Sequence, residues 1–301
     1  MSHDHSPALR HHPVQGICFM LLASFLFALA DALGKQLMGQ YPFMQVIWLR
    51  SVLGVLFIGA AILLTNPGQF TSRVPRWHLA RSVVGIMLTT GIFMGLKYIP
   101  LAEVTALVFA TPLLVALHAT VIMKERIGRG PLVAIVLGFV GVLLVVRPSP
   151  DHFHYAHLFV LGFACASAFM SITARRLSGT ESIFTLNFYV YPASMLLSTY
   201  PALSVWQMPD SAGWLLFLGV SGLATLALLC VTKAMHCASP TLVAPFDYTR
   251  IVWTVGIGWL VWGEFPDGLT ATGILVIMAC GLYLITRPRQ RQPQAEAKAG
   301  K

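Results

Sequence analysis

Ten long runs of mostly apolar residues constrain this chain more than any other feature. A helix needs about 20 such residues to cross the hydrocarbon core of a bilayer. The runs lie at residues 14–32, 43–64, 79–96, 101–123, 131–147, 157–175, 182–203, 213–233, 240–262 and 269–286. Their residues do not alternate between apolar and polar, as those of membrane-barrel strands do. The sequence therefore predicts an all-α integral membrane protein with ten transmembrane helices.

The composition agrees with a surface that faces lipid. Only 10% of the 301 residues are charged, whereas a soluble domain carries roughly 25%. The first run is not expected to be a cleaved signal, because no small-residue cleavage site follows it and Asp31 and Lys35 come at its end. Eight spans are the alternative, since the third and fourth runs, and the eighth and ninth, have very short connections. Each run is long enough to cross alone, which favours ten.

The net charge of +9 invites a nucleic-acid interpretation, but the distribution of the charges argues against it. With the N-terminus inside, fifteen of the twenty lysines and arginines fall in cytoplasmic segments, as the positive-inside rule requires. The outer segments hold Lys35, Lys97 and Arg147, and Arg50 and Arg250 lie within spans. We expect the lipid bilayer as partner, no nucleic acid, and an inner-membrane location. Both tails are predicted to be cytoplasmic: residues 1–13 and the basic residues 287–301.

The chain contains two similar halves. Each has a lysine, a proline within a span, a glutamate, a glycine-rich span and a basic-proline pair, in that order. The landmarks are Lys97, Pro112, Glu125, Gly138 and Arg147-Pro148, then Lys233, Pro245, Glu264, Gly273 and Arg287-Pro288. Five spans per half is an odd number, so the halves must be inverted relative to each other in the membrane. We predict two inverted five-helix repeats, residues 14–147 and 157–286.

This pattern resembles the drug/metabolite transporter (DMT) superfamily, of the type built from two EamA-like repeats. The resemblance is carried by residues 106–117 running to Lys124-Glu125-Arg126, residues 239–248 running to Gly263-Glu264, the 31–35 segment and the Trp48-Leu49-Arg50 triplet. It covers about residues 14–288. It implies ten helices, a central cavity between the halves and transport without ATP. It is nearly silent on the substrate.

Charged residues inside the spans mark the candidate substrate site, because charge in hydrocarbon costs a few kcal/mol and usually serves function. The candidate substrate-binding residues are Asp31, Lys35, Trp48, Arg50, Lys97, Asp247, Tyr248 and Arg250. Asp31 and Lys35 are four residues apart, and Asp247 and Arg250 three, so each pair could form on one helix face. A purely structural role is as plausible for Asp31, Lys35 and Lys97, since side chains near a span end can snorkel.

Cations outnumber carboxylates among these groups, which predicts a cavity that attracts an anionic or zwitterionic substrate. Arginine stays charged, and its planar fork suits carboxylates. Pro112 and Pro245 each remove a backbone hydrogen bond within a span, and bends at repeat-related places point to a site near the midplane. Glu125 and Glu264 are expected to cap helices or form loop salt bridges rather than carry protons.

No metal site and no cofactor are predicted. The five cysteines show no disulfide framework or CxxC motif. Histidines crowd two places, and solvated polar segments are the favoured interpretation of both. They are His3, His5, His11 and His12 in the N-terminal tail, and His152, His154 and His157 after the fifth span. Because imidazole is a common metal ligand, the sharper hypothesis links them to metal chelates and makes a carboxylate-rich metallophore one candidate substrate.

The leading function is secondary transport of a small organic metabolite, with efflux slightly favoured because many members of the resembled superfamily export. Uptake of riboflavin or S-adenosylmethionine is the alternative. A membrane-embedded enzyme is remote, because the chain lacks G-x-S-x-G and H-E-x-x-H motifs and paired catalytic carboxylates. A P-loop is also missing. Coupling to a proton or ion gradient, and a monomeric or homodimeric state, are left open.

Overall fold

The computed structural model describes residues 13–122, 128–149, 152–177, 180–238 and 240–286, and all regular elements in these ranges are helices. Eight segments are long and apolar enough to cross a membrane. Seven are single helices: α1 (Pro13–Gln40), α2 (Phe43–Thr65), α3 (Pro75–Tyr98), α6 (Arg129–Val146), α7 (Ala156–Leu177), α10 (Ser211–Cys237) and α13 (Gly268–Thr286). The eighth joins α4 (Leu101–Val108) and α5 (Thr111–Ile122).

Two further crossings are built from shorter pieces. One consists of α8 (Ile183–Phe188) and α9 (Tyr191–Ser204). The other consists of α11 (Pro240–Val243), the 3-10 helix η2 (Ala244–Thr249) and α12 (Arg250–Trp262). A short 3-10 helix, η1 (Pro67–Phe70), connects α2 to α3. Each piece is shorter than the roughly 20 residues that one crossing requires, but each chain of pieces is long enough, which makes ten crossings.

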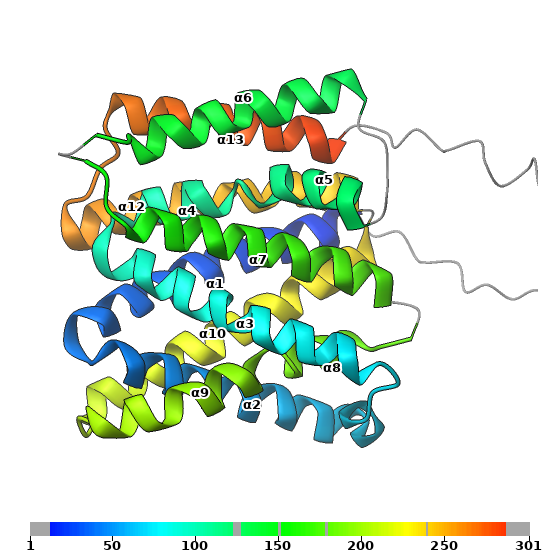
Figure 1. The fold of residues 1–301 in the computed structure, drawn as a ribbon, viewed down its shortest axis with the longest axis vertical. Helices are drawn as coiled ribbons and strands as arrows, with labels where there is room; N and C mark the ends of the chain where they lie inside the picture. Colours follow the sequence, from blue (N-terminus) through cyan, green and yellow to red (C-terminus); the bar gives the residue numbers. More distant parts are fainter. Residues whose placement is uncertain (1–12, 123–127, 150–151, 178–179, 239, 287–301) are drawn as a thin grey trace, which may run out of the picture.

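The crossings run back and forth along the bundle, and the start of α1 and the end of α13 lie at the same end (Figure 1). We call this the inner end, after the orientation that the charges predict. The opposite, outer end carries the α1–α2, α3–α4, α6–α7, α9–α10 and α12–α13 connections. The even number of crossings explains why the described chain starts and finishes at one end.

Helix packing relates the two halves by an approximate two-fold axis. α1 packs on α10, and α3 packs on α7. These are the first with the eighth crossing and the third with the sixth, so exchanging the halves converts one pair into the other. α2 packs on α9 and α6 packs on α13, and each of these pairs maps onto itself. The predicted architecture of two inverted five-helix repeats is confirmed.

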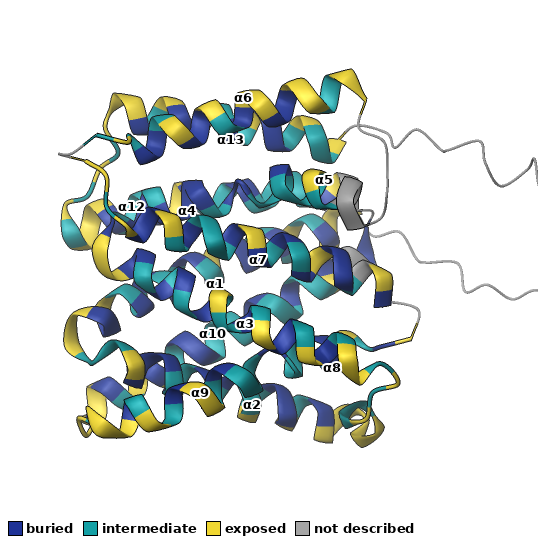
Figure 2. Cartoon of the chain, in the orientation of Figure 1, coloured by how far each residue is buried: buried dark blue, intermediate teal, exposed yellow. Residues whose placement is uncertain are grey.

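Exposed residues lie on the outside of the bundle (Figure 2), and many of them are large and apolar. Exposed residues gather on the outward faces of α6, α13, α2 and α9, and they include Leu64 of α2 at 87% exposure. Leu260 of α12 is also exposed, at 77%. Water would not tolerate so continuous an apolar surface on a monomer. The outer surface of the bundle is therefore suited to face lipid. The packed core lies inside, between α6 and α13 on one side and α2 and α9 on the other (Figure 1).

The predicted bends fall where the prolines lie. α4 ends at Val108, and Pro112 stands in the first turn of α5. Pro245 lies in η2, where the backbone is not α-helical. A third break, at Tyr189 between α8 and α9, is not foreseen in the sequence analysis, although Pro192 begins the next helix. Proline lacks the N–H that a continuous helix requires, which ends one piece and starts the next.

Two details differ from the sequence expectations. α1 continues to Gln40, so Asp31 and Lys35 lie within a helix rather than at its end. The segment after residue 32 contains good helix formers such as Leu and Met, so the helix continues beyond the end of the apolar run. Arg81 is one of the fifteen basic residues that the sequence analysis assigns to cytoplasmic segments, but it is buried inside α3 at 2% exposure.

Candidate functional site

A cavity of about 540 Å³ lies between the two repeats. α1, α3, α5, α7, α10 and η2 supply most of its wall, and α2, α4, α12 and α13 each contribute one residue. Its lining extends from Asp31 and Leu96 to Ile285, the residue before the last of α13. This volume is within the usual range of small-molecule sites.

Four charged side chains line this cavity: Asp31, Arg50, Asp247 and Arg250. All four are predicted substrate-binding residues, and a fifth, Tyr248, lines it as well. α1, α2, η2 and α12 supply them, so both repeats contribute. The tertiary structure thus gathers five of the eight candidates around one space.

Asp31 and Arg250 form an ion pair that joins α1 to α12. The Nη2 of Arg250 donates to the Oδ2 of Asp31. The side chain of Arg250 is only 11% exposed, and that of Asp31 only 12%. The guanidinium also lies over the ring of Phe27, 5.1 Å from its centroid. The possible pair of Asp31 with Lys35 on its own helix is not formed, because Asp31 pairs with Arg250 of another crossing and Lys35 pairs with Glu264.

Asp247 is held differently. Its Oδ1 accepts a hydrogen bond of 3.1 Å from the hydroxyl of Ser24 on α1, and no described cation forms an ion pair with it. The possible ion pair of Asp247 with Arg250 is not formed in the described structure, although the Arg250 charge acts on Asp247. Asp247 lies in the 3-10 helix η2 while Arg250 begins α12, so the two do not share the face of one regular α-helix. The cavity wall therefore contains a carboxylate without a cationic partner among the described residues.

Arg50 is the matching cation. Its guanidinium lies 5.5 Å from the ring centroid of Tyr191, a cation–π contact. Its Nη1 is buried and makes no hydrogen bond in the described structure. No described carboxylate comes within ion-pair distance of it. Arg50 therefore keeps unused donor capacity at the cavity wall.

Aromatic rings form part of the apolar wall, beside aliphatic side chains. Phe109 lies 4.6 Å from Tyr248, ring centroid to ring centroid. The Tyr248 hydroxyl is buried against Gly281 and has no described hydrogen-bond partner. The remaining rings on the wall are those of Phe27, Phe93 and Phe163. Such walls suit a flat or aliphatic ligand body between polar ends.

The other three candidates lie outside the cavity lining. Trp48 donates from Nε1 to the hydroxyl of Thr199, 3.0 Å away, within the α2–α9 interface. Lys97 is exposed at the end of α3, where its Nζ lies 5.1 Å from the ring centroid of Tyr98. Lys35 points toward the outer end, one turn beyond Asp31. A helix-face argument does not locate the contact of Trp48, because its partner Thr199 belongs to another crossing.

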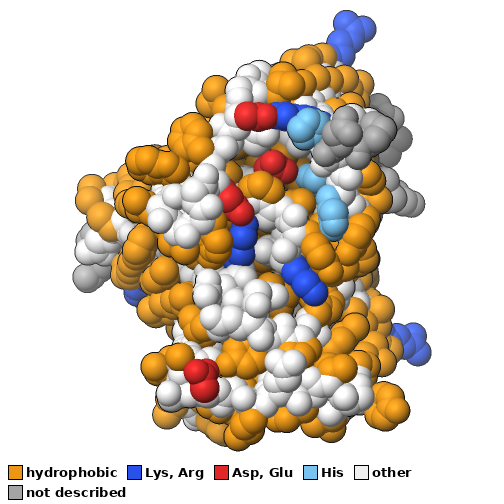
Figure 3. Space-filling model, turned by 90° about the vertical axis from the view of Figure 1, so that its left-hand side faces the viewer, with side chains coloured by type: hydrophobic (Ala, Val, Ile, Leu, Met, Phe, Trp, Pro, Cys, Tyr) orange, Lys and Arg blue, Asp and Glu red, His pale blue; other side chains and the backbone are white. Residues whose placement is uncertain are grey.

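Lys35 forms a second ion pair between the repeats, with Glu264. Its Nζ lies 2.5 and 2.6 Å from the two carboxylate oxygens, and the backbone N–H of Leu101 donates to the same carboxylate at 3.1 Å. Gly263, at φ 70°, makes the left-handed turn that ends α12 and precedes Glu264. The expected salt-bridge role of Glu264 is confirmed, and Glu125 lies outside the described residues. Charged side chains surround a hollow at this outer end (Figure 3).

Two more pairs hold the outer end. His157 of α7 lies 3.1 Å from the carboxylate of Glu103 on α4, measured from Nε2. Arg147, which caps α6, pairs with Asp267 before α13, and this hydrogen bond holds the pKa of the Asp267 carboxyl well below its usual range. His154 stacks on Tyr98, with ring centroids 4.8 Å apart. The described residues contain no group of three metal-ligating side chains, and the N-terminal histidines lie outside them.

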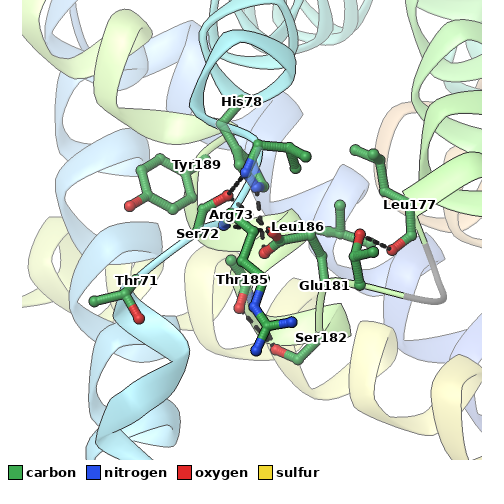
Figure 4. Close-up of polar contacts among 12 residues, drawn as sticks. Thr71, Ser72, Arg73, His78, Leu177, Glu181, Ser182, Thr185, Leu186 and Tyr189 are labelled. Atoms are coloured by element: carbon green, nitrogen blue, oxygen red, sulfur yellow. Dashed lines mark hydrogen bonds and ion pairs between the residues drawn. The ribbon is translucent and has the colours of Figure 1, made fainter.

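The inner end contains a polar cluster that the sequence analysis did not detect. His78 of α3 and Glu181, which precedes α8, are both buried, with 3.5 Å between Nε2 and Oε2 (Figure 4). Ser72 and the backbone N–H of Arg73 donate to the other oxygen of Glu181. Tyr189 packs on the His78 ring, 4.4 Å between centroids. The available signal was a His and a Glu near span ends in different repeats.

Arg81 lies one turn further along α3. It donates to the backbone oxygens of Met170 and Leu186 and to the hydroxyl of Thr173, at 2.9, 3.1 and 2.6 Å. These acceptors belong to α7 and α8 of the second repeat. The arginine therefore ties the two repeats together through uncharged groups.

A model described as the EamA-like transporter family matches the chain twice, over residues 14–147 and 154–287. A pseudopaline exporter of Pseudomonas aeruginosa (strain UCBPP-PA14) is 31% identical over 88% of this chain and 94% of its own length. A riboflavin transporter of Vibrio cholerae is 30% identical over 90% and 93%. An S-adenosylmethionine uptake transporter of Rickettsia prowazekii is 25% identical over 90% and 92%.

A solved crystal structure has the same fold. It superposes with a TM-score of 0.61 at 20% identity, over 91% of this chain and 96% of that chain. Together with the family match, this similarity covers nearly all of the described bundle.

Proposed function

Because the chain belongs to the EamA-like transporter family of the DMT superfamily, we propose that it is an inner-membrane secondary transporter of a small anionic or zwitterionic organic metabolite. Family membership makes it a transporter and not an enzyme. The proposed orientation places both termini in the cytoplasm, which follows the excess of basic residues at the inner end. Transport would draw on a proton or ion gradient, since the chain carries no P-loop.

The observation that carries this proposal is the position of Arg50. A guanidinium inside a membrane is costly unless something pairs with it. Arg50 lines the central cavity, and its Nη1 has no hydrogen-bond partner among the described residues. Arginine binds carboxylates and phosphates through two parallel hydrogen bonds. An anionic group on the substrate would complete this contact.

Efflux is the favoured direction. A relative at 31% identity is named as an exporter, and its similarity covers most of both chains. A carboxylate-rich metallophore is one candidate cargo, since it would present several anionic groups to Arg50. Uptake of riboflavin or S-adenosylmethionine is the second candidate function, favoured by the relatives that carry those names.

Metabolite profiling of cells and medium tests the proposal. A deletion strain would be complemented with the wild type, with Arg50→Gln or with Arg76→Gln, an exposed arginine of α3 outside the cavity. We expect at least one anionic or zwitterionic metabolite to accumulate in the deletion strain, and Arg76→Gln but not Arg50→Gln to restore its level. Membrane abundance of each variant is measured in parallel. Full complementation by Arg50→Gln at normal abundance would contradict the proposal.

Metal limitation separates the candidate cargoes. Growth without added iron or zinc should deplete a chelating metabolite from the medium of the deletion strain if a metallophore is exported. Unchanged chelator levels in that medium would remove the metallophore as a candidate. Accumulation of labelled riboflavin or S-adenosylmethionine by cells that overproduce the wild type would instead establish uptake.

A further inference from the structure

Resting on the function proposed above, the geometry points to a cavity with two opposite poles, Arg50 and Asp247, that selects a zwitterion. The anionic group of the substrate would bind Arg50, and a protonated nitrogen would bind Asp247. This narrows the substrate class, because it excludes purely anionic and uncharged molecules.

Two of the four charged side chains that line the cavity pair with each other. Asp31 and Arg250 satisfy each other through their ion pair. Arg50 has a cation–π contact with Tyr191 but no carboxylate partner, and Asp247 has the hydroxyl of Ser24 but no cationic partner, among the described residues. The cavity therefore holds one unmatched charge of each sign.

Leaving both Arg50 and Asp247 without an ion partner inside the membrane costs free energy. A buried charge is stable when it is paired and hydrogen-bonded. A buried charge that is left without its partner is strongly destabilising. Asp247 forms no ion pair with Arg250, whose guanidinium pairs with Asp31, although the Arg250 charge lies near enough to attract it. No described residue forms an ion pair with either group, which leaves a ligand, a proton or a solvent cation for Asp247 and a ligand or a solvent anion for Arg50. One zwitterion meets both needs with no net charge moved into the membrane.

The rest of the cavity wall indicates what kind of body the substrate has. Asp247 belongs to the broken crossing of the second repeat, and Arg50 to α2 of the first. Phe109 and Phe163 line the cavity, and the hydroxyl-bearing residues Ser167, Ser171 and Thr111 line it too. The substrate between the poles would be an apolar or aromatic body with a few hydrogen-bonding groups.

The test uses purified protein in liposomes loaded with a ¹³C-labelled extract of small cytosolic metabolites as the probe. Release into the outer buffer is followed by mass spectrometry for wild type, Asp247→Asn, Asp247→Glu and Asp267→Asn. The last removes a carboxylate from the outer surface rather than from the cavity. Asn is close in shape to Asp, and elution from gel filtration shows which variants fold.

We expect every species released by the wild type to contain both a carboxylate or phosphate and a nitrogen protonated at pH 7. Asp247→Asn should slow release about tenfold or more, as expected for removal of one partner of a buried charge pair. Asp247→Glu should retain part of the activity, and Asp267→Asn should match the wild type.

Two results would overturn the inference. One is wild-type release of organic anions or uncharged compounds that lack a protonated nitrogen, a readout that needs no variant. The other is release from folded Asp247→Asn at the wild-type rate. Failure of the proposed function looks different: liposomes with wild-type protein would release nothing beyond protein-free liposomes.

Discussion

The guanidinium of Arg250 on α12 is paired with the carboxylate of Asp31 on α1, across 219 residues of sequence and across the boundary between the repeats. This pair occupies the wall of the central cavity. It removes one cation and one carboxylate from those that a substrate can engage, and it ties the broken crossing of the second repeat to the first helix of the first.

Removal of either member of this pair should destabilise the protein. Asp31→Asn leaves the charge of Arg250 without its partner, and breaking a buried ion pair costs about 3–5 kcal/mol. The double variant Asp31→Asn/Arg250→Gln should lose less than the two single losses combined, because neither charge is then orphaned. Melting temperatures in detergent for the four proteins of this cycle measure the coupling. Additive losses would show that the pair contributes nothing of its own.

The Lys35–Glu264 pair should hold the outer end of the cavity closed. Glu264 binds Lys35 and the N–H of Leu101, so Glu264→Gln weakens contacts to two other crossings. In a background without native cysteines, Ser167→Cys on the cavity wall reports access. We expect an impermeant maleimide added outside intact cells to label this cysteine several-fold faster after Glu264→Gln.

Two matched variants check this interpretation. The swap Lys35→Glu/Glu264→Lys should restore protection, because it re-forms the pair with its charges exchanged. Asp267→Asn breaks the neighbouring surface pair with Arg147 and should leave protection intact. Equal labelling of all variants and the unmodified background would mean that the pair does not control access.

Gly273 should not tolerate a side chain. A Cβ there would lie 2.7 Å from the carbonyl oxygen of Gly141, where α13 crosses α6. Gly273→Ala is expected to cost about 1–3 kcal/mol through overpacking. Gly256→Ala is the matched control, because a Cβ at Gly256 in α12 meets no atom within 4 Å. The control should be neutral or gain up to about 1 kcal/mol from helix propensity; equal melting temperatures for both variants would refute the close contact.

Arg81 should matter for stability in a way that its neighbour Arg76 does not. Arg81→Gln removes three hydrogen bonds to α7 and α8, and each buried acceptor left unpaired costs about 1–3 kcal/mol. Arg76 is exposed on the same helix, so Arg76→Gln should stay within about 0.5 kcal/mol of the wild type. The check is the detergent melting temperature, and similar values for both variants would contradict the inter-repeat role.

The contribution of Asp267, on the outer face, to the stability of the protein should depend on pH. Its pKa is lowered in the folded protein, first by the hydrogen bond from Arg147. Its stabilisation is therefore fully present above the ordinary carboxyl pKa of about 3.9 and is lost as the pH falls through the lowered value. Asp267→Asn should melt slightly below the wild type at pH 7, by about 1 kcal/mol or less for so exposed a pair. The two melting temperatures should converge under strongly acidic conditions, and a gap that widens there would contradict the assignment.

The crossings could be located from the sequence because their length has a local cause. A run of about 20 apolar residues is stable in lipid wherever it stands in a chain. α2, predicted at residues 43–64, spans Phe43–Thr65, and α6, predicted at residues 131–147, spans Arg129–Val146. The repeat landmarks were readable for the same reason, since Pro112 and Pro245 disturb their own helices.

The charge partners could not be located in this way. Spacing along one helix suggested that Asp31 pairs with Lys35 and Asp247 with Arg250, yet each side chain except Asp247 found its ion partner on another segment. Such contacts span more than 200 residues and exist only after the repeats pack together. The His78–Glu181 cluster at the inner end escaped detection for the same reason.

By itself, the sequence determined that this chain crosses the membrane ten times in two inverted repeats, because apolar length and repeated landmarks act locally. Its resemblance to a transporter family added the expectation of transport. Only the tertiary structure decided which charges neutralise each other and which stay unmatched. A side chain in a membrane takes the partner that packing brings within reach, and Arg250 lies closer to Asp31 than spacing along the chain could reveal. Arg50 and Asp247 were thereby left at the cavity wall without ion partners among the described residues.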